Sequence, residues 1–196
     1  NSLLSVESLL DFALEYKYDK HHLDFHYRSK HPYLIDFSNV AFYNGKLRPL
    51  PRFESENPIT FYQVDGTFHE YMNEAEALKV IEILKQIQPR EDGSYPSVGV
   101  ATFNISQRNF IRKKLLWLRN QPAEQEFAEK LTALEQAGLF IKNLENIQGD
   151  ERDIIILSVT YGKKKDGKFT QSFGPLNQQK GYKLLNVIIT RAKEKI

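Results

Sequence analysis

The sequence predicts a three-layer α/β domain, in which a mostly parallel β-sheet is covered on both faces by helices. Two observations lead to this prediction. Segments rich in β-branched and apolar residues alternate along the chain with segments of helical periodicity. The strand segments are also almost continuously apolar, which is typical of strands that are buried on both faces of a sheet. Because ligands of such sheets gather at the carboxyl ends of the strands, polar clusters beside the strand segments are candidate sites.

The first half of the chain is expected to contain three helices and two strands. The apolar face of residues 5–16 indicates a helix, and an aromatic-rich stretch contains a short helix around residues 32–42. Asn73 and Glu76 have the spacing of a capping box, which predicts a helix that begins there and runs to about residue 88. The strand candidates are NPITFYQV, residues 57–64, and SVGVATF, residues 97–103, the second as a central strand.

The second half is expected to contain two helices, two strands and a final segment that fits either structure. The helices cover residues 105–120 and 123–137, and Gly138 is expected to end the second one. The last segment, KLLNVIITRAKEKI at residues 183–196, is interpreted as a helix, although its β-branched run also fits a strand. The two strands are LFIKNL, residues 139–144, and DIIILSVTY, residues 153–161.

The composition is that of an ordinary globular domain. The 196 residues are 41% hydrophobic and 27% charged, and the net charge of +2 does not by itself predict nucleic-acid binding. Cysteine is absent, which excludes disulfides and thiolate metal sites and fits a cytoplasmic protein. No apolar run is long enough to span a membrane, and no signal-peptide pattern is present. Because the sequence starts without methionine and stops within a charged segment, we expect a piece of a longer protein.

One stretch, LENIQGDERDIIILSVTYG at residues 144–162, joins a polar turn to an apolar strand. Gln148 and Gly149 come directly before a cluster of alternating charge that contains Asp150, Glu151 and Asp153. A charged surface turn is the simplest interpretation of this cluster. The alternative is that the three carboxylates hold the metal of a nuclease, which also needs a basic partner at a geometry that sequence does not specify.

Two further patterns resemble functional motifs but fail the tests for them. GKKKDGK, residues 162–168, has the spacing of a phosphate-binding loop, but Phe169 stands where Ser or Thr would bind magnesium, and no helix is expected to follow. We interpret it as a solvated basic loop, with contact to a nucleic-acid backbone as the alternative. Neither a cysteine nor a His-Glu-x-x-His pattern supports a metal site among the four clustered histidines, His21, His22, His26 and His31.

Three separated motifs change this interpretation. The chain contains, in this order, HYRSKHPYLIDFSNVAFYNGKL, IKNLENIQGDERDIIILSVTYG and GPLNQQKGYKLLNVIITRAKEKI. Together they resemble the second, C-terminal RecA-like domain of superfamily 1 DNA/RNA helicases, in particular large bacterial members of the nonsense-mediated-decay helicase branch. VGVATFN and Gln107 resemble the strand-plus-glutamine segment of that branch. The resemblance covers nearly the whole chain and implies one RecA-like (P-loop NTPase-type) domain over residues 1–196, with residues 1–50 as a lead-in that contains HYRS.

The resemblance implies an ATP site shared with an upstream RecA-like domain, where ATP binds with Mg²⁺. Arg28 of HYRS and Arg191 of ITRAK are similar to two arginines that contact the γ-phosphate, a task that suits the bidentate guanidinium. Gln148 is similar to a residue that couples the two sites, and these three are the expected catalytic residues. The alternatives are an ordinary surface ion pair for Arg28 and a simple helix-surface charge for Arg191. The expected nucleotide-binding residues are Tyr27, which would stack on the base or else pack in the core, and Gly149 and Glu151, at the ribose and phosphates.

By the same resemblance, single-stranded DNA or RNA crosses the other edge of the domain. Relatives often have Thr-Pro-Tyr where this chain has Thr102-Phe103-Asn104. The chain lacks the phosphate-binding loop and the Asp-Glu box that lie in the upstream domain of the family, so we expect the isolated chain to be inactive. A nucleic-acid-binding module without motor activity and a metal-dependent nuclease are the alternative functions. The expected contacts to the strand are Thr102, Asn104, Ser158 and Thr190.

Overall fold

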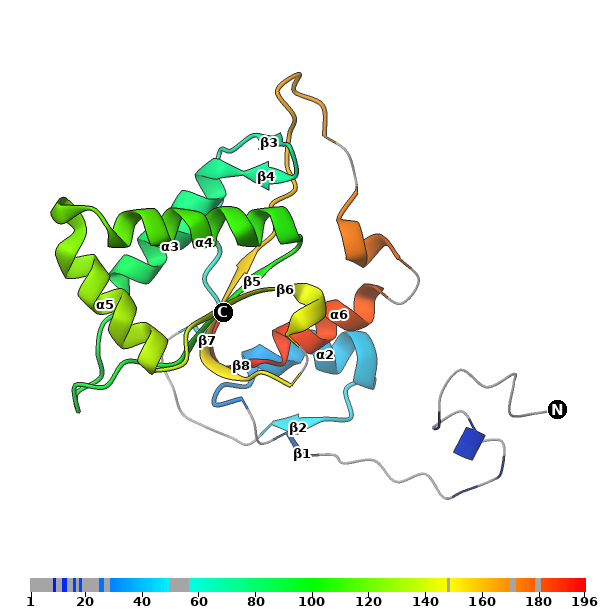
Figure 1. Cartoon of the computed structure of the whole chain (residues 1–196). Coiled ribbons are helices and arrows are strands. Elements are labelled where there is room, and N and C mark those ends of the chain that lie inside the picture. The colour runs from blue at the N-terminus through cyan, green and yellow to red at the C-terminus, as the bar shows by residue number, and fades with distance from the viewer. Residues whose placement is uncertain are drawn as a thin grey trace.

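A four-stranded parallel sheet forms the centre of the molecule (Figure 1). The computed structural model describes residues 9, 12, 13, 16, 18, 25–26, 29–49, 57–147, 149–169, 172–178 and 181–196. Helices cover both faces of the sheet, so the predicted three-layer α/β fold is confirmed. The strand order is β6 (Phe140–Asn143), β5 (Val98–Thr102), β7 (Arg152–Ser158) and β8 (Ala192–Lys195).

Three helices cover one face of the sheet. They are α3 (Glu74–Gln86), α4 (Ile105–Arg119) and α5 (Gln125–Gln136), which form the green group in Figure 1. Their apolar stripes pack against side chains of the two inner strands, β5 and β7. Leu84, Ile111 and Leu134, one from each helix, are completely buried there. This core is the larger of the two and holds the helical layer rigidly on the sheet.

The opposite face is covered by α2 (Tyr33–Tyr43) and α6 (Gly181–Ile189), with short 3₁₀ helices η2 (Leu144–Asn146) and η3 (Gly174–Asn177) beside them. Leu34 of α2 and Ile188 of α6 meet Ile155 of β7 in this second core. Ile156, the next residue of β7, belongs to the first core instead. Successive side chains of a strand point to opposite faces, so the apolar run of β7 supplies both cores at once.

The predicted helix boundaries are largely confirmed, and so is the predicted cap at Asn73. The side chain of Asn73 accepts a hydrogen bond of 3.2 Å from the backbone N–H of Glu76 at the start of α3. Asn104 caps α4 in the same way, by accepting from the N–H of Gln107 at 2.9 Å. Gly138, which follows α5, has a φ of +97°, the left-handed conformation that ends many helices. The predicted short helix around residues 32–42 is α2.

Two predictions near the amino terminus have other outcomes. Residues 57–64 are not a strand: only Pro58 and Thr60 exchange backbone hydrogen bonds with Ile196, at 2.8 and 2.9 Å. The segment passes the edge of the sheet with Phe61 exposed to solvent, so tertiary context overrides its β propensity. The predicted helix over residues 5–16 falls mostly outside the described residues. The described residues also form four two-residue strands, namely β1 (Phe25–His26), β2 (Arg48–Pro49), β3 (Phe68–His69) and β4 (Met72–Asn73), and a short 3₁₀ helix, η1 (Pro122–Glu124).

The final segment, residues 183–196, does not form one continuous helix. Its β-branched run does not form a strand either. Helix α6 includes the β-branched residues and ends at Ile189, after which Ala192–Lys195 form β8. The prediction of a helix over residues 183–196 is therefore wrong for its last third. The reason is tertiary: Arg152 and Ile154 of β7 pair with Ala192 and Lys195, and this pairing turns a charged, helix-favouring sequence into an edge strand.

Candidate functional site

The amino-terminal edge of the sheet brings together two of the motifs that were singled out in the sequence. Gly149 and Glu151 lie on the turn before β7, and Arg191 lies on the turn before β8. A backbone hydrogen bond of 3.1 Å joins these turns, because the N–H of Arg152 donates to the carbonyl of Arg191. Residues that are far apart in the sequence are thus neighbours at one edge of the sheet.

Arg191 is held at its backbone and at the base of its guanidinium group. Its backbone N–H donates to the carbonyl of Ile188 at 2.9 Å, and its Nε donates to the carbonyl of Val187 at 2.9 Å. Both carbonyls belong to the last turn of α6, where the helix dipole favours a positive charge. The side chain is half-buried, and the bond from its Nε fixes the base of the planar fork at the helix end. Such a fork matches the oxygens of a phosphate or carboxylate group.

In the turn before β7, a ligand would contact main-chain atoms rather than a side chain. Gly149 has a φ of +90°, and among the described residues no atom other than those of its chain neighbours lies within 4 Å of the place where a Cβ would be. A ligand group can therefore approach the main chain closely at this point. Glu151 is half-buried, with its carboxylate 4.0 Å from Nζ of Lys193 on β8. The turn thus places an open backbone and one carboxylate beside the basic residues that begin β8.

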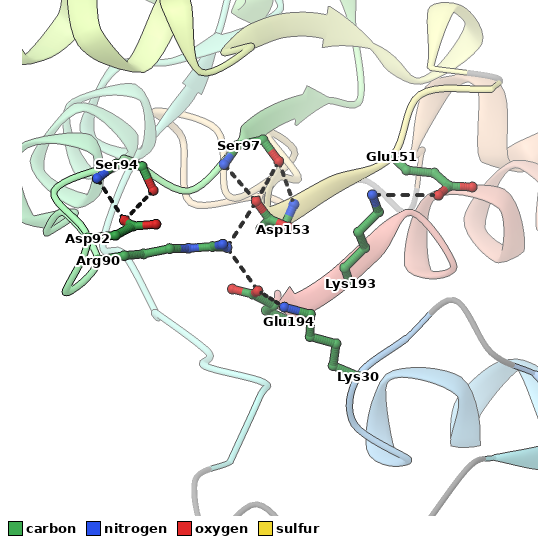
Figure 2. A network of polar contacts seen from close by, with 9 residues as sticks. All are labelled: Lys30, Arg90, Asp92, Ser94, Ser97, Glu151, Asp153, Lys193 and Glu194. Carbon is green, nitrogen blue, oxygen red and sulfur yellow. Dashed lines mark hydrogen bonds and ion pairs between the residues drawn. The ribbon is translucent and has the colours of Figure 1, made fainter. Parts of the chain in front are cut away.

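A network of polar contacts ties this edge to the rest of the molecule (Figure 2). Asp153 accepts hydrogen bonds from the backbone N–H and the Oγ of Ser97, at 2.9 and 2.8 Å. Arg90 contacts Asp153 at 3.1 Å and Glu194 at 2.9 Å, and Lys30 pairs with the same carboxylate oxygen of Glu194. Four segments meet here: the lead-in, the loop between α3 and β5, and the starts of β7 and β8.

The network sets the ionisation of Asp153. Partial burial opposes the charged carboxylate, but the two hydrogen bonds from Ser97 and the charges of Arg90 and Lys193 outweigh it. They hold the pKa of Asp153 below its ordinary value of 3.8. The carboxylate is therefore charged at neutral pH and acts as a permanent anchor for Arg90.

The lead-in docks on β8 next to Arg191. Ser29 donates its Oγ hydrogen bond to the carbonyl of Ala192 at 3.3 Å, and the N–H of Lys30 donates to the carbonyl of Lys193 at 2.6 Å. Ser29 is the last residue of the HYRS motif. Tyr27 and Arg28, the two residues of that motif with predicted roles, lie outside the described residues, as does Gln148. Their roles stay predictions.

The carboxyl-terminal edge of the sheet carries a different group of polar residues. Thr102 and Ser158 end β5 and β7, face one another in register, and are completely buried. Thr102 donates its Oγ1 hydrogen bond to the carbonyl of Asn104 at 2.8 Å, and Asn104 caps α4. The structure brings these three predicted residues together. Their positions also show that the two hydroxyl groups shape this edge from inside rather than from its surface.

Gln107 links the carboxyl edge to α3 and was expected only as part of a sequence segment. Its Oε1 accepts from the backbone N–H of Asn73 at 2.9 Å, and its Nε2 donates to the carbonyl of Asn73 at 3.0 Å. The same Nε2 lies 3.3 Å from Oγ of Ser158. Gln107 is completely buried, so it satisfies backbone groups that no water reaches. An uncharged glutamine two positions into an amphipathic helix gave no signal of this role.

Glu76 has a second function that the capping-box pattern did not predict. Its carboxylate does not turn back to the helix start, where Gln107 already pairs with the backbone N–H of Asn73. Both of its oxygens instead accept from the N–H of Thr160 at 2.9 Å. Thr160 has a φ of +71°, a rare conformation for a β-branched residue. Burial raises the pKa of Glu76 above its ordinary value of 4.5, against the opposing hydrogen bonds from Thr160, Ser158 and Val159.

Thr190 is separated from the other three predicted nucleic-acid contacts. It lies on the turn between α6 and β8, at the amino edge, while Thr102 and Ser158 lie at the carboxyl edge. Its Oγ1 donates to the carbonyls of Asn186 and Val187, at 3.0 and 2.9 Å. These bonds close the last turn of α6 directly before Arg191, so Thr190 supports the amino edge.

The three carboxylates that resembled a metal site contact separate cations, whereas His21 and His22 of the histidine cluster lie outside the described residues. Asp150 pairs with Lys142 at 2.6 Å, while Glu151 and Asp153 contact other cations. In the part of the chain that the structure describes, no group of three His, Cys, Asp or Glu residues could hold a metal ion. The glycine-lysine loop is closed by an antiparallel bridge between Lys163 and Phe169 and does not lead from a strand into a helix. These arrangements give no support to a nuclease or to a phosphate-binding loop.

The fold and its two polar edges define a three-layer RecA-like α/β domain. A family model described as an AAA domain matches residues 5–196, and the chain belongs to that family. Proteins from Mycoplasma pneumoniae and Mycoplasma genitalium, each called an uncharacterized ATP-dependent helicase, are both 37% identical over 177 residues, or 89% of this chain. The chain spans 15% of the length of these relatives. None of the described helices is long and apolar enough to cross a membrane.

Proposed function

We propose that the chain is the C-terminal motor domain of an ATP-dependent superfamily 1 helicase and supplies part of an interdomain ATP site. Its family and the names of its relatives support a helicase-type domain. The finer proposal is carried by one observation: the turns that hold Gly149, Glu151 and Arg191 are joined by a hydrogen bond at one edge of the sheet. An arginine fixed at a helix end, beside an open glycine turn, is a suitable receptor for a phosphate chain.

The residues at the amino edge fit a nucleotide better than they fit a metal ion. Basic side chains and exposed backbone at Gly149 suit phosphate oxygens, whereas the nearby carboxylates are engaged with separate cations. Mg²⁺ would therefore take its protein ligands from the upstream RecA-like domain. In phosphoryl transfer, ATP supplies a γ-phosphate whose charge spreads over its oxygens in the transition state. The part of Arg191 is to place a delocalised positive charge against those oxygens when the domains close.

Single-stranded nucleic acid is proposed to pass the carboxyl edge of the sheet. Because Thr102 and Ser158 are buried, their part is to fix the ends of β5 and β7, and the main chain around Asn104 and Val159 would meet the phosphates. ATP would then bind at the amino edge of the sheet and the nucleic acid at the carboxyl edge. ATP-driven closing at one edge would move the other edge along the strand, which is the work of a motor domain.

The test is nucleic-acid-stimulated ATP hydrolysis by the natural protein that includes the upstream motor domain. Arg191→Ala is expected to lower turnover by about 10³-fold or more, because a transition-state charge loses its partner. Arg191→Lys keeps the charge but not the planar fork and should recover only a small part. Arg48→Ala, at an exposed arginine of β2, is the control and should leave turnover unchanged.

Two outcomes would contradict the proposal at different points. Turnover that survives Arg191→Ala would leave the helicase-type domain in place and remove Arg191 from the ATP site. Robust, metal-dependent turnover by residues 1–196 alone would show that the chain is not half of a motor. If the natural protein bound a single strand but hydrolysed no ATP, the function would be that of a nucleic-acid-binding module.

A further inference from the structure

A groove on the outer side of β6 is a candidate binding surface in addition to the amino and carboxyl edges of the sheet. We propose that this groove binds the phosphodiester backbone of a nucleic-acid strand and extends its path away from the carboxyl edge, along α4. The inference rests on the proposed function, because it assumes that a strand reaches that edge. It adds a binding surface whose two arginines, Arg108 and Arg112, lie outside the sequence motifs.

The groove is a hollow of about 640 Å³ between α4, α5 and the edge strand β6. Arg108 and Arg112 line it from α4, Glu135 from α5, and Lys142 and Asn146 from β6 and the turn that follows it. Three of these side chains are cationic and one is anionic. Since β6 is the outermost strand, the hollow lies on the side of the sheet and is separate from the amino edge with Arg191.

The positive charges of the two arginines are not neutralised. Arg108 donates only to amide oxygens, to Asn109 at 2.8 and 3.1 Å and to Asn143 at 3.3 Å. Arg112 is exposed, and within the described ranges no carboxylate lies in ion-pair distance of either arginine. The other charges are already paired: Lys142 with Asp150 at 2.6 Å, and Glu135 with Arg119 at 2.6 Å. The groove thus presents two guanidinium groups that still lack an anion.

The charge of α4 is unusual for this protein. Residues 105–119 contain no acidic residue and five basic ones, which are Arg108, Arg112, Lys113, Lys114 and Arg119. The whole chain has a net charge of +2, so the remaining residues together carry −3. Like charges along one helix repel each other, and a cation in its first turn opposes the helix dipole. Folding therefore does not explain this pattern, whereas an anionic partner does.

The groove is continuous with the carboxyl edge. Asn143, which accepts from Arg108, ends β6 and stands directly beside Thr102 in the register of the sheet. Asn104, Arg108 and Arg112 follow one another at intervals of four residues, so they lie along one side of α4 with a rise of about 6 Å per step. A row of sites at such intervals suits a chain of phosphates better than a single phosphate group. It begins where the single strand is proposed to pass.

The experiment compares two double variants of the same helix with the same change in charge. Arg108→Gln/Arg112→Gln removes the two arginine charges of the groove, leaves Lys142 paired with Asp150, and keeps amide donors at both positions. Lys113→Gln/Lys114→Gln also removes two charges from α4 but outside the groove. Binding of fluorescein-labelled oligothymidylate and oligouridylate to the full chain is measured by fluorescence anisotropy over a series of salt concentrations, and circular dichroism checks that each variant is folded.

The expected result is specific to the groove variant. Its affinity should fall by on the order of tenfold at 0.1 M salt, and the slope of log K against log salt should become shallower by about 1.4, or 0.7 for each lost phosphate contact. The lysine variant should change the slope much less. Cross-linking of a thiothymidine-containing strand to peptides of α4 and β6 in the unmodified protein is the second expected result.

Three outcomes would overturn the inference. Equal losses in both double variants would mean that net charge alone attracts the strand, while the proposed function would stand. If labelled polyglutamate bound to the groove in preference to the oligonucleotides, the partner would be an acidic polypeptide. If the unmodified chain bound neither oligonucleotide, the groove would not be a nucleic-acid site, and the ATP site would still be judged separately by the Arg191 variants.

Discussion

The two edges of the sheet are both rich in polar residues, but they are built in different ways. At the amino edge, ion pairs such as Arg90 with Asp153 and Glu194 are half exposed and join four segments. At the carboxyl edge, Gln107, Ser158 and Thr102 are completely buried and make uncharged hydrogen bonds, Gln107 to Ser158 and Thr102 to the carbonyl of Asn104. The difference shows that polarity has two uses in one sheet: buried polar groups determine the shape of an edge, and exposed charges remain accessible to a ligand.

The largest effect on stability is expected at the carboxyl edge. Gln107→Leu would leave the N–H of Asn73 without its partner and would remove the bond from Gln107 to the carbonyl of Asn73, which also accepts the first intrahelical bond of α3. Because a buried group that loses its hydrogen bond keeps its full desolvation penalty, the free energy of unfolding should fall by about 2–4 kcal/mol. Urea unfolding followed by circular dichroism measures this change.

Gln88→Leu is the matched control for this variant. Gln88 is exposed and donates only to the carbonyl of Gln86, so its replacement should change the free energy of unfolding by less than about 0.5 kcal/mol. If the two leucine variants were equally stable, the buried network would not be what holds the carboxyl edge.

The second prediction concerns how stability depends on pH. Glu76 at the carboxyl edge and Asp153 at the amino edge contribute to this dependence with opposite signs. The raised pKa of Glu76 means that the folded chain binds its proton more tightly than the unfolded chain. Stability from this group is therefore full below 4.5 and is lost as the pH rises through the folded pKa. The lowered pKa of Asp153 has the reverse effect: its contribution is present above 3.8 and is lost as the pH falls through the folded pKa.

Urea unfolding at a series of pH values separates the two groups. Glu76→Gln should gain stability relative to the unmodified chain as the pH rises from 4.5 toward neutrality, because the buried charge is gone. Asp153→Asn should be less stable at neutral pH and should approach the unmodified chain in acid. The same sign for both variants would refute the contrast between a buried carboxylate and a paired one.

The smallest effect is expected from the ion pairs of the amino edge. Arg90→Gln removes contacts to Asp153 and Glu194, but the side chain of Arg90 is 41% exposed and solvent screens both pairs. The loss should be below about 1 kcal/mol and should decrease as salt is added. Differential scanning calorimetry at low and high salt measures it, with Arg48→Gln as an exposed control. A loss as large as that of Gln107→Leu would make this network a structural element comparable with the buried one.

Sequence reasoning was most successful where local chemistry decides the structure. The cap at Asn73, the stop at Gly138 and the buried run of β7 follow from short-range patterns, and the three-layer fold follows from their alternation. It failed where contacts between distant segments decide. Residues 192–195 became a strand only because β7 offers a free edge, and no property of the segment itself predicts that pairing.

For the candidate site, too, some relations between residues were predicted from the sequence and others could not be. The resemblance identified the turns at Gly149 and Arg191 as parts of one site, and the structure places them side by side. It could not show that Thr190 lies at the opposite edge from Thr102, because this depends on which end of a strand each turn adjoins. The unusual bonds of Glu76 are a product of tertiary packing, as is the lack of a carboxylate partner for Arg108 and Arg112 among the described residues, so a one-dimensional pattern carries little trace of them.

The docking of the lead-in on β8 has a consequence for the biosynthesis of the protein. Ser29 bonds to Ala192, a residue 163 positions later in the chain, and Thr60 bonds to Ile196. At translation rates of 5–20 residues per second, the ribosome needs roughly ten to thirty seconds to make that intervening stretch. Throughout this time the surface that receives Ser29 and Lys30 does not exist. Strand β8, which completes the sheet, is therefore made late in synthesis, and Ser29 and Lys30 can dock only after it has formed.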